Sequence, residues 1–243
     1  HGKVSKHIHW CRDGSGYGKF YVDGWITTAH QEITDEPKYA WFLETKAIIP
    51  QLYDWLDNNI QHCIDTFDLI VVHDKKYLGI HPKFVWCPVG GSWIQDKRIY
   101  VKSKLVSMIT SHKRMCPGHD KRLQWYDKLK DSVDCYGRDI KFIEKKEDGL
   151  KDYMFSVAIE NAEYDGYFTE KILDCFLCGT IPVYLGAPNI GDYFNMDGVL
   201  ILKDGLDLTP QLYYSKLEAV IDNFNRALDY EVLEDWIYTN YLN

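Results

Sequence analysis

Residues 160–190, ENAEYDGYFTEKILDCFLCGTIPVYLGAPNI, contain the pattern that decides the fold. It reads as the end of a strand, a polar loop, a short helix, a glycine, a second strand and a Gly-Ala-Pro turn. A strand followed by a helix and another strand is the repeating unit of a parallel α/β sheet. We therefore expect this stretch to lie inside an α/β fold.

The expected helix begins after Thr169, with Glu170 and Lys171 as its first residues. Thr169 is expected to cap the helix by accepting a backbone N–H bond. Free N–H groups and the positive end of the helix dipole favour an anion there. A cation, a carboxylate and backbone donors together suit a diphosphate attached to a ribose. In the alternative interpretation, Glu170 only compensates the helix dipole and Lys171 is solvated.

Other parts of the chain alternate between the same two patterns. Strand-like apolar runs occupy residues 68–73, 83–87, 104–110, 154–159, 181–185 and 199–202. Helical spacing of apolar residues is found at 48–60, at 119–132 and over most of 211–242. This alternation predicts parallel sheets with ligands beyond the carboxyl ends of the strands, where Asn161 and Gly186 fall.

A Gly-rich polar segment, PVGGSWIQDKR at residues 88–98, is the expected joint between two halves. We predict an N-terminal, acceptor-side Rossmann-like domain over residues 1–97. Residues 98–243 are predicted to form a donor-binding Rossmann-like domain with C-terminal helices. Two such domains with a cleft between them make the GT-B architecture.

Composition narrows the class of protein. The 243 residues are 46% hydrophobic and 26% charged, with a net charge of −8 and no basic stripe, so nucleic acid is an unfavourable partner. No apolar run is long enough for a membrane helix and no signal peptide is recognised, so stable membrane insertion is not expected. The seven cysteines are scattered without a framework spacing, which predicts reduced thiols and a cytoplasmic location.

The stretch 160–190 resembles the donor-binding signature of glycosyltransferase family 10, the α1,3-fucosyltransferases. The family pattern is Glu-Asn, a short loop, Tyr-x-Thr-Glu-Lys, an apolar helix, Gly, and a Pro-Val strand ending in Gly. The matching residues are Glu160, Asn161, Tyr167, Phe168, Thr169, Glu170, Lys171, Ile172, Gly179, Pro182, Val183, Gly186 and Pro188. Ala162 departs from the Ser or Thr of many members, which puts one hydroxyl contact in doubt.

An earlier segment resembles the other donor motif of the family. The strand and loop KLVSMITSHK precede Arg122 in HDKRLQWYDKL, and Val133, Asp134, Tyr136 and Gly137 follow. The resemblance implies that Arg122 grips the diphosphate, for which its planar fork is suited. It also implies that Glu170 accepts hydrogen bonds from the ribose, and that Asn161 and Tyr167 contact donor phosphate or sugar. The neighbours Lys113, Arg114 and Lys121 complicate the assignment of the phosphate cation.

The resemblance implies an inverting enzyme that moves fucose from GDP-fucose to a glycan hydroxyl, onto GlcNAc or glucose units. Negative charge grows on the leaving diphosphate, and a metal or protein cations must stabilise it. The sequence contains no Asp-x-Asp pair of the kind that metal-dependent transferases use. We therefore expect no metal and no other cofactor, with Lys171 and Arg122 as the catalytic cations.

Inversion also needs a general base, which we expect in the N-terminal half. Glu44 in AWFLETKAI follows a short apolar run at the expected carboxyl end of a strand, and its position resembles that of a family Glu. Alternatively, Glu44 only begins a helix. The reserve candidates are Glu32, Asp23 and Asp74.

Three alternatives remain open at this stage. The donor could be another nucleotide sugar, the chain could be a non-catalytic glycan-binding descendant, or it could be a trimmed Golgi-lumenal domain. Cys175 and Cys178 form a CxxC, but both fall in an apolar run, and we interpret them as core residues rather than as a redox or metal site.

Overall fold

The computed structural model describes residue 5 and residues 19–243. These divide into two compact units. One comprises residues 91–231, and the other comprises the described residues up to Gly90 together with Val232–Asn243. The division differs from the predicted one at two places, because residues 91–97 belong to the unit of residues 91–231 and the last twelve residues belong to the unit that contains Gly90.

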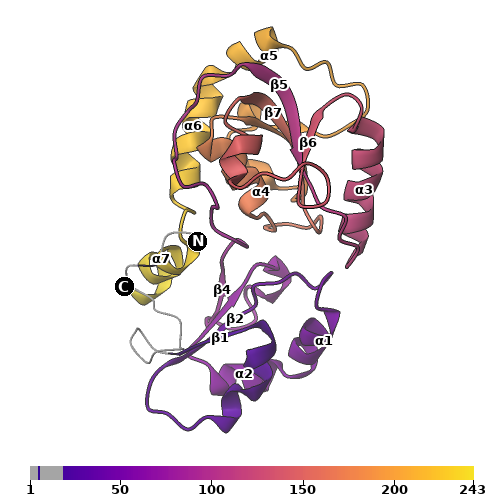
Figure 1. Ribbon diagram of the computed structural model, residues 1–243. Coiled ribbons are helices and arrows are strands. Elements are labelled where there is room, and N and C mark those ends of the chain that lie inside the picture. The colour runs from indigo at the N-terminus through magenta and orange to yellow at the C-terminus, as the bar shows by residue number, and fades with distance from the viewer. Residues whose placement is uncertain (1–4, 6–18) are drawn as a thin grey trace. The chain divides into compact units, whose positions relative to one another are not determined.

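The unit of residues 91–231 is built on a five-stranded parallel sheet with the order β6-β5-β7-β8-β9 (Figure 1). The strands are β5 (Lys104–Ile109), β6 (Asp134–Tyr136), β7 (Tyr153–Ile159), β8 (Ile181–Leu185) and β9 (Leu200–Ile201). The predicted α/β class with parallel strands is confirmed. Four of the five strands were predicted, whereas the three residues of β6 were too short to be recognised.

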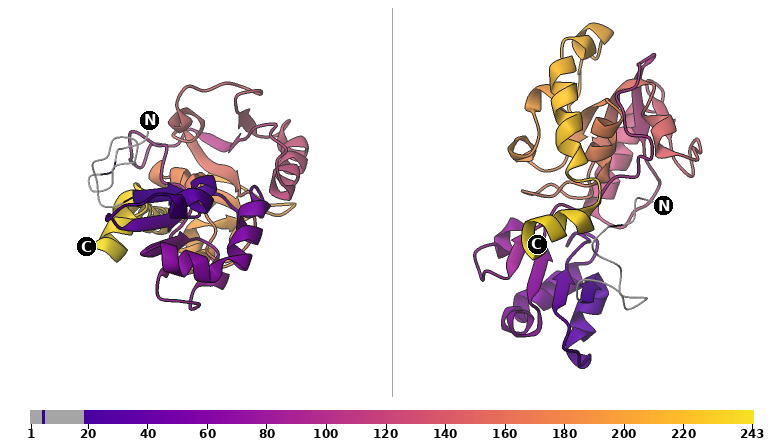
Figure 2. Two further views of the ribbon diagram at one scale, coloured as in Figure 1. Left: turned by 90° about the horizontal axis from the view of Figure 1, so that it is seen from below. Right: turned by 90° about the vertical axis from the view of Figure 1, so that its left-hand side faces the viewer.

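Helices cover this sheet. They are α3 (Pro117–Leu129), α4 (Glu170–Leu177), α5 (Pro210–Tyr214) and α6 (Leu217–Leu228). The short 3-10 helices are η3 (Lys146–Gly149), η4 (Ile190–Asp192) and η5 (Met196–Gly198). Helix α4 contacts β7, β8 and α6, and α6 is the long helix in the right-hand view of Figure 2.

Helix α4 is buried almost completely, which explains its sequence. Ile172, Leu173 and Cys175 are at most 2% exposed, and Cys178, just after the helix, is fully buried. Burial raises the pKa of the Cys175 thiol to about 12, so the thiol stays protonated and unreactive. The interpretation of the CxxC as core packing agrees with this burial.

The strand order places a reversal point at the centre of the sheet. From β5 the chain moves outward to β6, and then returns to the other side of β5 as β7. Loops that leave β5 and β7 therefore diverge in opposite directions. A crevice opens beyond the carboxyl ends of these two strands, where open α/β sheets bind ligands.

The other unit holds a four-stranded parallel sheet in the order β1-β2-β3-β4. Its strands are β1 (Lys19–Val22), β2 (Lys38–Trp41), β3 (Leu69–Val72) and β4 (Phe84–Trp86). Its helices are α1 (Pro50–Asn58), α2 (Ile60–Thr66), α7 (Leu233–Ile237), the 3-10 helices η1 (Asp23–Gln31) and η2 (Lys75–Tyr77), and the π-helix η6 (Tyr238–Leu242). Within residue 5 and residues 19–243, no helix has the length and hydropathy required to cross a membrane.

Candidate functional site

A pocket of about 280 Å³ lies beyond the carboxyl ends of β5 and β7, at the reversal point of the sheet. Its charged and polar lining includes residues from the loops after β5 and β7, from α3, from η3 and from the start of α4. These residues are Thr110, Ser111, Lys113, His119, Arg122, Lys146, Asn161, Glu170 and Lys171. The pocket thus collects the predicted residues Arg122, Asn161, Glu170 and Lys171.

The start of α4 is fixed by a buried carboxylate at the end of β7. Thr169 caps the helix, since its Oγ1 accepts the N–H of Lys171 at 3.3 Å. Glu160 receives the Thr169 N–H at 2.9 Å and the Thr169 hydroxyl at 2.7 Å. The Glu160 side chain is fully buried and does not line the pocket. Its contacts make Glu160 a support for the helix start, and a direct contact of Glu160 with the donor stays a prediction.

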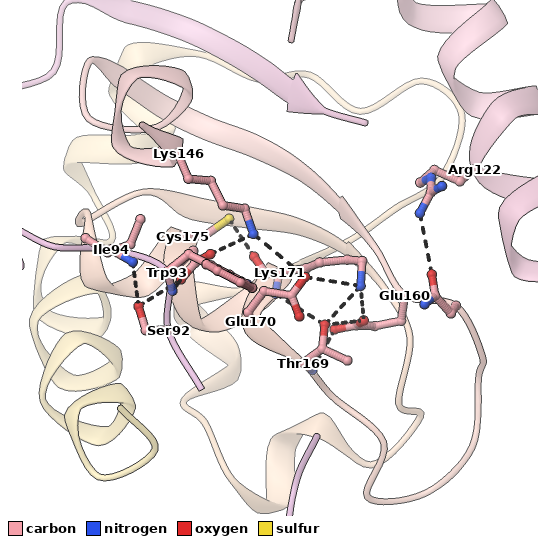
Figure 3. Close-up of polar contacts among 12 residues, drawn as sticks. Ser92, Trp93, Ile94, Arg122, Lys146, Glu160, Thr169, Glu170, Lys171 and Cys175 are labelled. Carbon is pink, nitrogen blue, oxygen red and sulfur yellow. Dashed lines mark hydrogen bonds and ion pairs between the residues drawn. The ribbon is translucent and has the colours of Figure 1, made fainter. Parts of the chain in front are cut away.

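Lys171 reaches two carboxylates (Figure 3). Its Nζ lies 3.2 Å from Glu160 Oε2 and 3.6 Å from Glu170 Oε1. Burial disfavours the ammonium ion, but the charges of Glu160 and Glu170 more than compensate and raise the pKa of Lys171. Lys171 therefore stays protonated at neutral pH, in a fixed position.

Glu170 is held by two lysines. Burial opposes ionisation, yet the charges of Lys171 and Lys146 lower the pKa of Glu170 to about 2. Lys146 Nζ lies 3.8 Å from Glu170 Oε1 and 2.6 Å from Oδ2 of the buried Asp174. Glu170 is thus a permanent hydrogen-bond acceptor at the pocket wall, as ribose hydroxyls would require.

Lys146 is a pocket residue that the sequence did not reveal. It lies in the charged run KKEDG, where one lysine cannot be told from its neighbours. The only available signal was Asp174 in the middle of an apolar helix, because a buried carboxylate needs a cation. Sequence alone could not say where that cation comes from.

Arg122 projects into the pocket from α3 and is 7% exposed. Its Nη1 lies 3.4 Å from Asn161 Oδ1, and its Nη2 lies 3.4 Å from Ser111 Oγ. These are long bonds, and Nε is buried without a partner. No carboxylate of the described chain forms an ion pair with this guanidinium, and burial lowers its pKa. An uncompensated buried cation in a pocket is suited to bind an anion.

The contact between Arg122 and Asn161 depends on a glycine. A Cβ at Gly118, in the first turn of α3, would lie 2.1 Å from the Asn161 carbonyl oxygen. Only glycine therefore lets α3 approach the loop after β7 this closely. Asn161 is part of the pocket wall, whereas Tyr167 is 1% exposed and is not among the lining residues. A donor contact by Tyr167 stays a prediction.

The other basic residues near Arg122 differ in whether they form ion pairs or line the pocket. Arg114 pairs with Asp120 at 3.2 Å, and Lys121 pairs with Glu163 at 2.5 Å. Lys113 lines the pocket and is exposed. His119 also lines the pocket, and burial lowers its pKa, so the ring is neutral at pH 7. Of these cations, Arg122 and Lys113 line the pocket, whereas Arg114 and Lys121 are paired outside its lining, and the assignment of a phosphate cation stays a prediction.

Glu44 lies in the other unit, three residues after β2, and its side chain is exposed. Its backbone is held firmly. Asp23 Oδ1 accepts the N–H of Leu43 at 2.9 Å and of Glu44 at 3.1 Å. The Glu44 carbonyl accepts bonds from Tyr53 at 2.8 Å and from His73 at 3.2 Å. The expected position at a strand's carboxyl end is observed, while a role as base stays a prediction.

The reserve carboxylates are engaged in different ways. Asp23 has a left-handed backbone (φ +48°), and burial raises its pKa despite the two backbone bonds that it accepts. Glu32 pairs with Lys19 and accepts a bond from Tyr21 at 2.5 Å. Asp74 caps η2 and lies 3.3 Å from Lys46. In the described part of the chain, no three His, Cys, Asp or Glu side chains gather as a metal site would require.

Comparisons with known proteins agree with this geometry. Residues 99–198 match the model of glycosyltransferase family 10 (fucosyltransferase), C-terminal domain. The chain is 29% identical over 109 residues to the alpha-(1,3)-fucosyltransferase FucT of Helicobacter pylori, covering 42% of this chain and 20% of that protein. It is 36% identical over 75 residues to alpha-(1,3)-fucosyltransferase B of Drosophila melanogaster, covering 30% and 16%. The chain thus spans about a fifth of these relatives' length.

A crystal structure of an α1,3-fucosyltransferase with GDP is similar in fold. The TM-score is 0.52 at 16% sequence identity, over 92% of this chain and 71% of that chain. At this identity the likeness concerns the fold alone.

Proposed function

We propose that the chain is a fucosyltransferase-like enzyme that uses GDP-fucose, a proposal supported by the match of residues 99–198 to the C-terminal domain of glycosyltransferase family 10. The observation that carries the proposal is the pocket at the reversal point of the sheet. There the buried guanidinium of Arg122, without a carboxylate partner in the described chain, lies beside the ionised Glu170. A site for an anion, next to a carboxylate that accepts hydrogen bonds from hydroxyl groups, suits a diphosphate joined to a ribose.

In the proposed reaction a glycan hydroxyl attacks the anomeric carbon of fucose in a single displacement, which inverts the configuration. The bond to the diphosphate oxygen breaks, and GDP leaves with the electron pair. Arg122, together with Lys171, stabilises the charge that develops on the leaving diphosphate. Glu44 takes the proton of the attacking hydroxyl as general base.

The charge distribution refines the roles of the two cations. Lys171 and Lys146 face three carboxylates, Glu160, Glu170 and Asp174, so this cluster has a formal charge of −1. Lys171 therefore adds little net attraction for an anion. We propose that Arg122 binds the diphosphate and that Lys171 supplies a hydrogen-bond donor at a fixed position beside it. No metal is part of the proposal, because protein cations fill the role that a metal would have.

Two further parts of the proposal concern the domain architecture and the acceptor substrate. We propose that the two parallel sheets belong to Rossmann-like domains of a GT-B enzyme. We also propose a glycan as acceptor, as the relatives' names suggest. The cytoplasmic location stays a prediction.

Calorimetric titration with GDP, UDP and inorganic diphosphate tests the proposal. We expect GDP to bind more tightly than UDP, and diphosphate to compete with GDP. A mass-detected assay with GDP-fucose and simple disaccharides should then yield a fucosylated product. Tighter binding of UDP would indicate another nucleotide sugar. Glycan binding without any nucleotide binding would indicate a non-catalytic descendant.

A further inference from the structure

The cluster behind the pocket contains charged groups that the proposed reaction does not use. Asp174 and Glu170 lie one turn apart on α4, where two like charges repel. Lys146 lies between them and bridges the two carboxylates, and Figure 3 shows its contact with Glu170. Removing the ammonium group would leave two buried negative charges side by side. The position of Lys146 is therefore coupled to that of Glu170.

Asp174 has a second set of partners outside the pocket. Its Oδ1 accepts the Ser92 hydroxyl at 2.8 Å and the Trp93 N–H at 3.0 Å. Ser92 Oγ in turn accepts the Ile94 N–H at 3.0 Å. We call residues 91–96 the linker segment, since they begin the unit of residues 91–231 directly after Gly90. One oxygen of Asp174 thus holds the linker segment and the other holds Lys146.

A neighbouring carboxylate secures the rest of the linker segment. Glu147, which follows Lys146 in η3, accepts the Gln95 N–H at 2.5 Å and the Asp96 N–H at 3.3 Å. Glu147 and Asp174 are 5% and 0% exposed. Backbone N–H groups that bond to buried carboxylates exchange slowly with solvent only while those carboxylates stay in place. The order of the linker segment therefore depends on η3 and α4.

We propose that Lys146 and Asp174 are positioning residues that connect Glu170 in the donor pocket to the linker segment, so that nucleotide binding and linker order strengthen each other. The proposal rests on the proposed function, since it takes GDP as the ligand. A ribose bound to Glu170 fixes that carboxylate and with it Lys146. A fixed Lys146 keeps Asp174 oriented toward Ser92 and Trp93.

Amide hydrogen exchange with and without GDP tests the connection. GDP should slow the exchange of Trp93 and Ile94 amides in the wild-type chain by about tenfold, within the usual range of coupling between sites. In Asp174→Asn the amide oxygen still accepts the linker bonds, but the negative charge that holds Lys146 is lost. GDP should therefore no longer change the exchange of these amides. A merely structural Asp174 would change the basal exchange and leave the GDP effect intact.

A second variant tests the connection from the linker side and leaves all charged side chains in place. Ser92→Ala removes both bonds of the Ser92 hydroxyl, the one to Asp174 Oδ1 and the one from the Ile94 N–H, and because coupling is reciprocal it should weaken GDP binding severalfold. Ser215→Ala is the control, since it also removes one serine hydroxyl, whose bond goes to the Leu212 carbonyl instead of to a buried carboxylate, and it should leave GDP affinity unchanged. Lys146→Met should weaken GDP binding at least tenfold.

The outcomes separate this inference from the proposed function. If GDP does not bind the wild-type chain, the proposed function and the proposed coupling are both wrong. If GDP binds but leaves the Trp93 and Ile94 amides unchanged, only the coupling is overturned. Equal GDP protection in the wild-type chain and in Asp174→Asn would likewise exclude Asp174 as the connection.

Discussion

Both parallel sheets carry polar residues where their strands end, but the two regions hold their charges differently. At the end of β7, Glu160 is fully buried and Lys171 is fixed by two carboxylates. At the end of β2, the Glu44 side chain is exposed, and its backbone donates a hydrogen bond to Asp23 and accepts hydrogen bonds from Tyr53 and His73. The first region is organised to keep its charges constant. The second holds the backbone firmly and exposes a carboxylate on the surface of its unit.

The difference fits two kinds of chemistry. Binding a diphosphate requires cations and acceptors that do not change protonation and cost little to organise. A general base must gain and lose a proton, so its pKa should lie near the working pH and its carboxylate must be accessible. The comparison therefore predicts that substitutions at β7 affect stability and affinity, whereas substitutions at β2 affect turnover.

The largest expected effect is on turnover at the β2 region. Glu44→Gln should lower kcat about 10²–10⁴-fold, the usual contribution of a general base, without a change in GDP affinity. Transfer kinetics and calorimetry with GDP measure the two quantities separately. Asp57→Asn is the control, because Asp57 is an exposed carboxylate of the same unit that pairs with Lys76 and was never a candidate base. Full turnover in Glu44→Gln would move the base to another residue, with Asp23 first, because burial raises its pKa.

The next largest effect concerns stability at the β7 region. Glu160→Gln should lower the free energy of unfolding by about 3 kcal/mol, because it removes one partner of a buried ion pair. Denaturant unfolding measures this loss. Glu163→Gln breaks an exposed pair with Lys121 and should change stability by less than about 1 kcal/mol. A Glu160→Gln variant as stable as the control would mean that the helix start does not depend on this charge.

The sequence predicted the α4 region well because its signals are local. The cap at Thr169, the acidic first turn and the following apolar run all lie within ten residues, and each reflects one helix end. The positions of Glu170 and Lys171 in the pocket follow from that helix. Strand β6 was missed because three residues are too few for a periodic pattern. The α/β class could be predicted from the remaining alternation.

The supporting network could not be predicted, because its contacts join distant parts of the chain. Lys146 and Asp174 are 28 positions apart, and Ser92 lies a further 54 residues before Lys146. No spacing rule connects them. Likewise, the last twelve residues were assigned with the preceding helices, whereas Tyr241 bonds to the Trp86 carbonyl at 2.6 Å. Helical periodicity indicates which face of a helix is apolar, but not which sheet it covers.

A smaller effect distinguishes geometry from charge in the pocket. Arg122→Lys keeps the positive charge but loses the planar fork, so GDP should bind about 10–100-fold more weakly. Calorimetric titration measures the change. Arg114→Lys is the matched control, since Arg114 is exposed and pairs with Asp120 outside the pocket lining. Unchanged GDP affinity in Arg122→Lys would show that charge alone, rather than bidentate bonding, holds the phosphate.

The smallest expected effect is a pH dependence that tests whether the charges of the β7 region are constant. The folded pKa of Glu170 is about 2, below its ordinary value of 4.5, so its ion pairs stabilise the fold above pH 4.5 and are lost as pH falls through 2. The stability difference between the wild-type chain and Glu170→Gln should stay constant from pH 8 to 5. It should then shrink by about 1 kcal/mol between pH 4.5 and 3.5, at 1.36 kcal/mol per pH unit. Urea unfolding at each pH measures the difference. A difference that changed between pH 8 and 5 would mean that Glu170 titrates near neutrality, and the contrast with the exposed carboxylate of Glu44 would disappear.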